Sequence, residues 1–268
     1  MSGSPEAAWA RSGGSDQLEA ALQGLRRSMI RLVRGYHRLQ VRGELGAPAE
    51  PTLFLSNHGF GSIFDLNVLT AIAAIEDMRR DRPLTILVHQ IAWTVGLGPL
   101  LERLDAVAAS RGAARRAFAD GHDVLVFPGG DIDAFKPHRD RDRILFGGRD
   151  GFAAIAMECG APIVPIVTAG TGDTLYALPG GETVARTLRL DELLRLKSLP
   201  SSVSIPWGFN VGLVGFAPYL PLPVRLTTEA LPAMAPEDSE TAAAFAERIT
   251  EAMQTALLRN SRSSSPHH

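Results

Sequence analysis

Cysteine, net charge and long apolar runs are scarce in this chain of 268 residues. Its only cysteine, Cys159, excludes a disulfide framework and a multi-thiolate zinc site, and favours a reducing compartment. The net charge of −2 provides no overall attraction for nucleic acid. Residues 205–224 are uncharged, but their four prolines and three glycines disfavour a membrane-spanning helix. Residues 1–17 lack the apolar run of a signal peptide, so we expect a cytoplasmic protein.

Short apolar runs alternate with helical patterns between residues 46 and 258, as expected of a single α/β domain. The runs predict strands at 52–56, 84–89, 106–110, 123–128 and 162–170. The intervening segments predict helices near 62–80, 94–104, 112–121 and 150–159. Nearly continuous apolar strands joined by helices are typical of a mostly parallel sheet flanked by helices on both faces. Residues 1–15 and 259–268 are rich in small and polar residues and are predicted to be disordered.

Residues 16–45 are predicted to form an amphipathic helical segment ahead of this domain. Its leucine-rich stripe recurs at steps of three and four: Leu18, Leu22, Leu25, Met29, Leu32 and Tyr36. A basic stripe lies roughly opposite: Arg27, Arg31, Arg34 and Arg38. Such a helix either packs on the domain with its arginines solvated, or lies on a membrane surface with leucines among acyl chains and arginines at anionic headgroups.

Three loops of unusual composition follow predicted strands. They are NHGFGS (57–62), SRG (110–112) and PGGDIDAFKPHRDRDR (128–143). The carboxyl ends of parallel strands meet at one edge of a sheet, where ligands bind in doubly wound folds. We therefore expect these loops to line a common site. The charges of residues 138–143 alternate in sign and are expected to neutralise one another in solvent.

His58 is the best candidate for a general base, because an imidazole exchanges protons near physiological pH. Gly59 and Gly61 follow it and leave room for a substrate to approach. Two roles fit Asp65. It orients the imidazole through a hydrogen bond, or it completes a capping box with Ser62 at the start of the next helix. The sequence leaves both open.

Further candidates lie in the later loops. Gly129 and Gly130 let the backbone approach a ligand and can offer N–H groups to an oxyanion or phosphate. Arg111 is either an anion contact or a solvated surface residue, and Arg149 either an anion contact or a structural residue near a helix start. The chain has no G-x-S-x-G elbow, P-loop, H-E-x-x-H motif, or G-x-G-x-x-G after the first strand. A base without an obvious nucleophile or metal suits direct transfer to a hydroxyl group.

Taken together, these residues resemble the glycerolipid acyltransferase superfamily, which includes the lysophosphatidate acyltransferases. The order and spacing agree over residues 50–178. The matching positions are Asn57–His58, Arg111, Phe127–Pro128 followed by Gly129–Gly130, and Pro162 with Pro165. Two positions depart from the family pattern. Asp65 follows His58 after six intervening residues, where the family has four, and Gly129 stands where the family's Phe-Pro-Glu-Gly motif has Glu.

Residues 127–176 resemble the branch of diacylglycerol acyltransferases and phytyl ester synthases, in which Pro-Gly-Gly-x-x-Glu precedes Arg-x-Gly-Phe. Asp133 stands at the position of that branch's Glu. The resemblance implies an O-acyltransferase that moves a fatty acyl group from acyl-CoA or acyl carrier protein to a lipid hydroxyl. The acceptor would be a lysophospholipid, a diacylglycerol or a long-chain alcohol at a membrane surface. No metal and no further cofactor are expected.

In such a reaction His58, within the Asn57–His58 motif, would deprotonate the acceptor hydroxyl, and Asp65 or Asp133 would orient its imidazole. Two alternatives stay open. A thioester or lipid-ester hydrolase would use the same base with water as the acceptor. A catalytically inactive lipid-binding protein would keep the fold without the chemistry.

The resemblance also implies contacts to the substrates. Backbone N–H groups around Gly129–Gly130, or at the helix after Gly61, would stabilise the oxyanion. Arg111 and Arg149 would bind the phosphates of CoA or of the carrier arm. Asp133, at the position of the branch's Glu, would contact a substrate.

Overall fold

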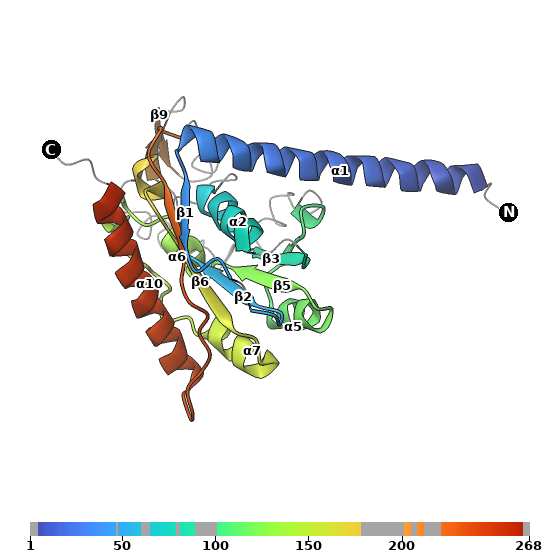
Figure 1. Ribbon diagram of the computed structural model, residues 1–268. Helices are drawn as coiled ribbons and strands as arrows, with labels where there is room; N and C mark the ends of the chain where they lie inside the picture. The colour runs from blue at the N-terminus through green and yellow to red at the C-terminus, as the bar shows by residue number, and fades with distance from the viewer. Residues whose placement is uncertain are drawn as a thin grey trace.

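The computed structural model describes residues 5–46, 48–59, 65–78, 81–88, 101–177, 201–204, 208–211 and 221–264. Within them a seven-stranded mixed sheet has the order β1-β10-β6-β2-β5-β3-β4 (Figure 1). Its strands are β1 (Gln40–Gly43), β2 (Leu53–Ser56), β3 (Leu84–Val88), β4 (Ala106–Ala108), β5 (Asp123–Val126), β6 (Ile163–Ala169) and β10 (Thr227–Ala230). A small antiparallel sheet contains β7 (Tyr176–Ala177), β8 (Ser201–Ser204) and β9 (Gly208–Val211).

Five neighbouring strands form the parallel part of the large sheet. β2 pairs in parallel with β5 on one side and with β6 on the other, and β3 joins β5 to β4 in the same direction. β10 runs antiparallel to β6, and β1 runs parallel to β10 at that edge. Each of the five apolar runs identified in the sequence contains one of the parallel strands. The prediction of a mostly parallel α/β sheet is therefore confirmed.

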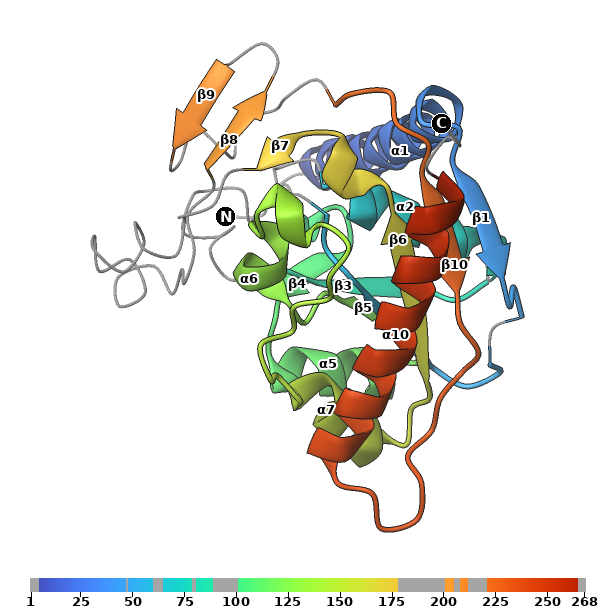
Figure 2. The ribbon, with the colours of Figure 1, turned by 90° about the vertical axis from the view of Figure 1, so that its left-hand side faces the viewer.

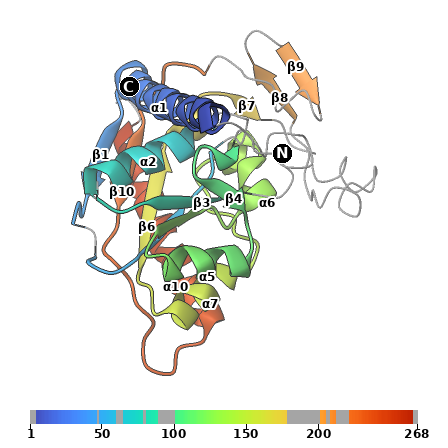
Figure 3. The same ribbon diagram turned by 90° about the vertical axis from the view of Figure 1, so that its right-hand side faces the viewer.

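Helices cover both faces of this sheet (Figures 2 and 3). One face carries α5 (Arg111–Ala119), α7 (Gly151–Cys159) and α10 (Ala242–Ser264); the other carries α1 (Pro5–Tyr36) and α2 (Leu66–Met78). In β2, Leu53 and Leu55 belong to the first core and Phe54 to the second. Alternate residues of a strand face opposite sides, so this continuous apolar run is buried on both.

Short helices lie in the loops at one edge: α6 (Gly130–Ala134), η1 (His138–Asp140) and η2 (Thr171–Asp173). The helices predicted at 112–121 and 150–159 correspond to α5 and α7. Residues 60–64 and 89–100 lie outside the described residues. The start of the predicted helix 62–80, most of the predicted helix 94–104, and Gly61 therefore also lie outside the described residues.

α1 packs on the domain through a face next to its leucine-rich stripe. Ile30 and Val33 are buried, whereas Leu25 and Leu32 are 55% and 66% exposed. Arg34, from the basic stripe, forms an ion pair with α2. The other members of the basic stripe are exposed: Arg27, Arg31 and Arg38. Among the described helices, none combines the length and apolar character needed to cross a bilayer.

Both ends of the chain are helical further than their composition predicts. α1 begins at Pro5, so residues 5–15 are helical where disorder is expected, and α10 continues past residue 259 to Ser264. In α10, the buried Asn260 accepts a hydrogen bond from Arg42 on β1, and this packing sustains the helix through a polar segment. In α1, each residue added to an existing helix gains one backbone hydrogen bond, which favours extension through Ala-rich sequence.

Candidate active site

β2 delivers Asn57 and His58 to the carboxyl edge of the parallel sheet. The strand ends at Ser56 between β5 and β6, and both neighbours run parallel to it. The loops after these three strands therefore open at the same edge. The expected convergence of the loop 57–62 with the loop 128–143 is found for the residues that the structure describes.

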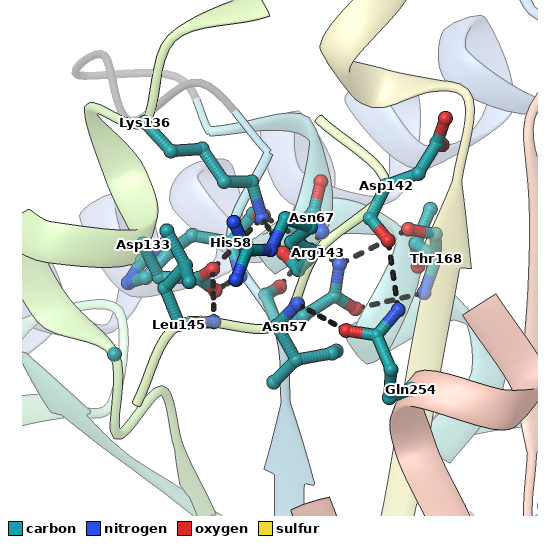
Figure 4. Close-up of polar contacts among 12 residues, drawn as sticks. Asn57, His58, Asn67, Asp133, Lys136, Asp142, Arg143, Leu145, Thr168 and Gln254 are labelled. Atoms are coloured by element: carbon teal, nitrogen blue, oxygen red, sulfur yellow. Dashed lines mark hydrogen bonds and ion pairs between the residues drawn. The ribbon is translucent and has the colours of Figure 1, made fainter. Parts of the chain in front are cut away.

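Asn57 anchors the end of β2 to β6. Its Nδ2 donates to Thr168 O at 3.1 Å, and its Oδ1 accepts from Thr168 N at 2.9 Å (Figure 4). The side-chain amide thus extends the β2–β6 ladder by a pair of hydrogen bonds, as a peptide group would. Asn67 Nδ2 donates to Asn57 O at 2.7 Å. Asn57 is buried and both ends of its amide are hydrogen-bonded, so it anchors the site; its expected catalytic role stays a prediction.

His58 and Asp65 form a close pair. His58 Nδ1 lies 2.5 Å from Asp65 Oδ2, although six residues separate the two in sequence. An ionised carboxylate can only accept, so Nδ1 carries the proton and the lone pair of a neutral imidazole lies on Nε2. The ring stacks on Phe127, with centroids 4.7 Å apart and planes at 30°. The His58 side chain is 17% exposed, which leaves the ring accessible.

Asp65 also caps α2, so the two roles that the sequence leaves open coexist. α2 begins at Leu66, immediately after Asp65, and Asp65 Oδ1 accepts from Asn67 N at 2.8 Å. This is an N-cap contact to the second helical residue, whereas a capping box would place the carboxylate at the third. One carboxylate oxygen therefore serves the helix and the other serves the imidazole.

Asp133 contacts the main chain of His58 and not its ring. Asp133 Oδ2 accepts from His58 N at 2.7 Å, and Oδ1 accepts from Lys136 Nζ at 2.8 Å and from Leu145 N at 3.1 Å (Figure 4). Its side chain is fully buried. A direct hydrogen bond to the imidazole and contact with a substrate, the two expectations for Asp133, do not fit this geometry. In the sequence, Lys136 stands out only as the first member of the basic run that follows the Pro-Gly-Gly turn, and its pairing with Asp133 is not predicted.

The Pro-Gly-Gly turn is held by Arg149. Arg149 Nη1 donates to Pro128 O at 2.8 Å and to Gly129 O at 2.7 Å, and Nη2 donates to Asp131 at 3.2 Å. Arg149 thus braces the turn, and its expected phosphate contact stays a prediction. A Cβ on Gly129 would lie 2.2 Å from that of Asp133, so glycine is required there for close packing.

The expected oxyanion donors of this turn are also partly engaged. Gly130 N donates to Phe127 O at 3.2 Å, and its φ of 50° is a left-handed conformation that favours glycine. The two glycines shape the turn that carries Asp133. Their oxyanion role stays a prediction, as does that of Gly61, which lies outside the described residues.

Arg111 stands apart from the residues above. It is exposed at the first turn of α5, where Ser110 caps the helix through a hydrogen bond from Ala113 N. β5 and β3 lie between β2 and β4, the strand that leads to Arg111. Hydrogen bonds from Arg115 lower the pKa of Glu158, and the charge of Arg111 adds a smaller lowering. The structure does not bring Arg111 into contact with His58.

The charged loop is largely self-neutralised, as expected. Within residues 138–143, Arg143 Nη1 lies 3.3 Å and Arg139 Nε 3.6 Å from the Asp140 carboxylate. Arg141 Nε lies 2.8 Å from Asp173 on η2, outside this segment. Cys159 is exposed at the end of α7. Partial desolvation of the thiol and the neighbouring Glu158 raise the pKa of Cys159, which disfavours a thiolate nucleophile.

The Acyltransferase protein family matches residues 38–169, a segment that contains β1 to β6 and every site residue described above. The crystal structure of PlsC, the 1-acyl-sn-glycerophosphate acyltransferase from Thermotoga maritima, shares the fold. Its TM-score is 0.51 at 13% identity, and the match covers 93% of this chain and 88% of that one.

Two curated relatives extend the comparison. A Gallus gallus protein named "DGAT1/2-independent enzyme synthesizing storage lipids" is 26% identical over 201 residues, which is 75% of this chain and 57% of that protein. An uncharacterised Mycobacterium tuberculosis protein is 27% identical over 183 residues, 68% of this chain and 49% of that one. The chain thus spans about half the length of these relatives.

Proposed function

We propose that this chain transfers a fatty acyl group from a thioester to a lipid hydroxyl, with His58 as the general base. The observation that carries the proposal is the His58–Asp65 pair, with 2.5 Å between Nδ1 and Oδ2, at the carboxyl edge of the sheet. The pair lies inside the acyltransferase-family segment, and it directs the free Nε2 lone pair toward an acceptor.

The reaction proceeds in two steps. Nε2 takes the proton of the acceptor hydroxyl while the hydroxyl oxygen attacks the thioester carbonyl carbon. The tetrahedral intermediate then collapses, the new oxygen ester keeps the acyl group, and the carbon–sulfur bond breaks. The departing sulfur takes its proton from the imidazolium, whose charge Asp65 stabilises until then.

We propose acyl-CoA or acyl carrier protein as the donor. In both, a pantetheine arm separates the thioester from the phosphate. Arg111 stands three strand positions along the sheet edge from His58, roughly 14 Å at ordinary strand spacing. At that separation Arg111 can bind the phosphate of a donor whose thioester lies at His58. Arg149 is less suited to this contact, because its guanidinium is hydrogen-bonded to the Pro-Gly-Gly turn.

We further propose that α1 attaches the protein peripherally to a membrane that supplies the acceptor lipid. Leu32 and Tyr36 are exposed, and the Tyr36 hydroxyl donates to Pro221 O at 2.9 Å, next to the exposed Leu222. Leu222 N in turn donates to Thr174 O, just after η2 in the loop that follows β6. The apolar surface of α1 therefore continues toward the edge of the sheet that holds His58.

Acyl transfer assays test this function directly. The purified protein is incubated with labelled acyl-CoA or acyl carrier protein and with vesicles that contain lysophospholipid, diacylglycerol or long-chain alcohol. Mass spectrometry then resolves the products. We expect a lipid ester, and we expect His58→Ala to lower the rate about 10²–10⁴-fold with the fold intact. His122→Ala is the matched control, because His122 lies just before β5 and is hydrogen-bonded to Thr85 on β3, at the opposite edge of the sheet.

Other outcomes would assign a different function. Release of free fatty acid without lipid ester would make the protein a hydrolase that uses water as the acceptor. Lipid binding with neither product, unchanged in His58→Ala, would show a catalytically inactive lipid-binding protein and refute the proposal.

A further inference from the structure

One buried ion pair holds the peptide groups on both sides of His58. The His58 N–H donates to Asp133 Oδ2 at 2.7 Å, and the His58 carbonyl accepts from Lys136 Nζ at 3.1 Å (Figure 4). Asp133 Oδ1 and Lys136 Nζ lie 2.8 Å apart, and the two side chains are 0% and 3% exposed. The pair thus fixes the backbone just after β2 by hydrogen bonds, although its residues lie 75 and 78 positions later in the sequence than His58.

The remaining bonding capacity of the pair is also used within the protein. Lys136 Nζ donates to Arg143 O at 2.8 Å, and Asp133 Oδ1 also accepts from Leu145 N at 3.1 Å. An ammonium group has three N–H donors, and Lys136 has three acceptors, so none is left for a substrate. Desolvation offsets the attraction within a buried ion pair, and apolar replacements are often as stable. The pair is therefore better explained by the position it imposes than by stability.

We infer that Asp133 and Lys136 are positioning residues for the base of the acyl transfer reaction, an inference that rests on the proposed role of His58. By holding both peptide groups of His58, the pair sets the direction in which the side chain leaves the backbone. The imidazole then stacks on Phe127 at 4.7 Å and reaches Asp65 at 2.5 Å. Because Phe127 and Asp133 both follow β5, the pair couples the loop after β2 to the loop after β5.

Because Asp133 and Lys136 carry opposite charges, removing one or the other should shift the pH profile in opposite directions. Three charged groups are bonded to His58 in the described part of the chain: Asp65 before α2, Asp133 on α6 and Lys136 just after it. Lys136→Met leaves the Asp133 carboxylate without its counter-charge, which favours the imidazolium and moves the acid midpoint of the kcat/KM profile to higher pH. Asp133→Asn leaves the ammonium and moves that midpoint to lower pH. The double variant removes both charges and returns the midpoint toward the wild-type value.

The experiment compares these three variants with the wild type in kcat, in KM for donor and acceptor, and in the pH profile. Small displacements of a catalytic group cost up to about 10²-fold, so we expect Lys136→Met to lower kcat roughly 10- to 100-fold with little change in either KM. We expect midpoint shifts of opposite sign in the two single variants. The double variant, which buries no uncompensated charge, keeps the test valid if a single variant unfolds.

A matched control separates positioning from general loss of structure. Asp123 is also buried and accepts from Thr52 N at 2.9 Å, but it lies at the amino end of β5. We expect Asp123→Asn to lower thermal stability without moving kcat or the pH midpoint. The inference is overturned if Lys136→Met retains wild-type kcat and midpoint, or if both single variants shift the midpoint in the same direction. A rise in KM at constant kcat would also overturn it, because the pair would then be part of substrate binding.

Proton NMR tests the pair even if the wild type transfers no acyl group and the proposed function fails. The short hydrogen bond from His58 Nδ1 to Asp65 should give a far-downfield proton resonance, identified by its absence in His58→Ala. A positioning role predicts that this resonance is lost in folded Lys136→Met and retained in Asp123→Asn. Its persistence in Lys136→Met would overturn the inference whatever the activity.

Discussion

Replacing Asp65 with Asn separates the two tasks of this side chain. A carboxylate offers two acceptors, whereas an amide offers one acceptor and one donor group. In the wild type, Oδ1 accepts from Asn67 N at 2.8 Å and Oδ2 accepts from His58 Nδ1 at 2.5 Å. In Asp65→Asn the amide oxygen must stay with the Asn67 N–H, because an NH₂ group cannot accept. The NH₂ group then faces the imidazole, Nδ1 becomes the acceptor, and the ring proton moves to Nε2.

The expected effect on activity is large and the effect on stability is small. With Nε2 protonated, the neutral ring has no lone pair for the acceptor hydroxyl. We expect a rate loss of about 10²–10⁴-fold, or roughly 3–5 kcal/mol of activation free energy. Asn and Asp are comparable N-caps, so the free energy of unfolding should change by less than about 1 kcal/mol. Asp65→Ala also loses the cap, which costs typically about 1 kcal/mol more.

Acyl transfer rates and thermal unfolding of the wild type, Asp65→Asn and Asp65→Ala provide the measurement. For a domain of this size, 1 kcal/mol corresponds to a change in Tm of about 2–4 °C. We therefore expect Asp65→Asn to combine a near-normal Tm with a severe loss of rate. Near-normal rate at near-normal Tm would refute the argument, because the Asp65 carboxylate would then not determine which imidazole nitrogen is free.

Two further predictions concern α1 and its C-terminal end. Leu25→Glu combined with Leu32→Glu should abolish cosedimentation with anionic phospholipid vesicles. Leu258→Glu, at an exposed leucine of α10, is the control and should leave cosedimentation unchanged. Undiminished binding of the double variant would exclude α1 as the face that attaches to the membrane. Burial lowers the pKa of His37 from its ordinary value of 6.5, more than its hydrogen bond to Val224 O raises it. Near and below about pH 6.5 the unfolded chain therefore binds more protons than the folded protein. The His37 contribution to the free energy of unfolding should be fully present above that pH and be lost as the pH falls below it. His37→Gln should flatten this decrease in unfolding free energy between about pH 7 and pH 5, and an unchanged slope would contradict the assignment to His37.

The parallel core can be predicted from the sequence because the pattern that defines it is local. In β2, three successive apolar residues cannot all face one side of a strand, so the run itself implies burial on both faces. β1 and β10 have no such pattern. β10 reads Thr-Thr-Glu-Ala, and it becomes a strand because it pairs with β6 on one side and β1 on the other. The packing face of α1 likewise depends on α2, since its sequence offers more than one apolar side.

Sequence alone determined that an imidazole stands at a strand end with a carboxylate nearby, because His58 and Asp65 lie within one short loop. The tertiary structure decided what each neighbour does. Asn57 extends the sheet because β6 lies beside it, Arg149 braces the Pro-Gly-Gly turn, and Asp133 grips the His58 backbone instead of its ring. The physical reason is that a sequence shows which hydrogen-bond donors and acceptors exist, whereas which of them pair depends on how close they lie in the folded protein. For groups 75 or 111 residues apart, that distance exists only after the strands have assembled.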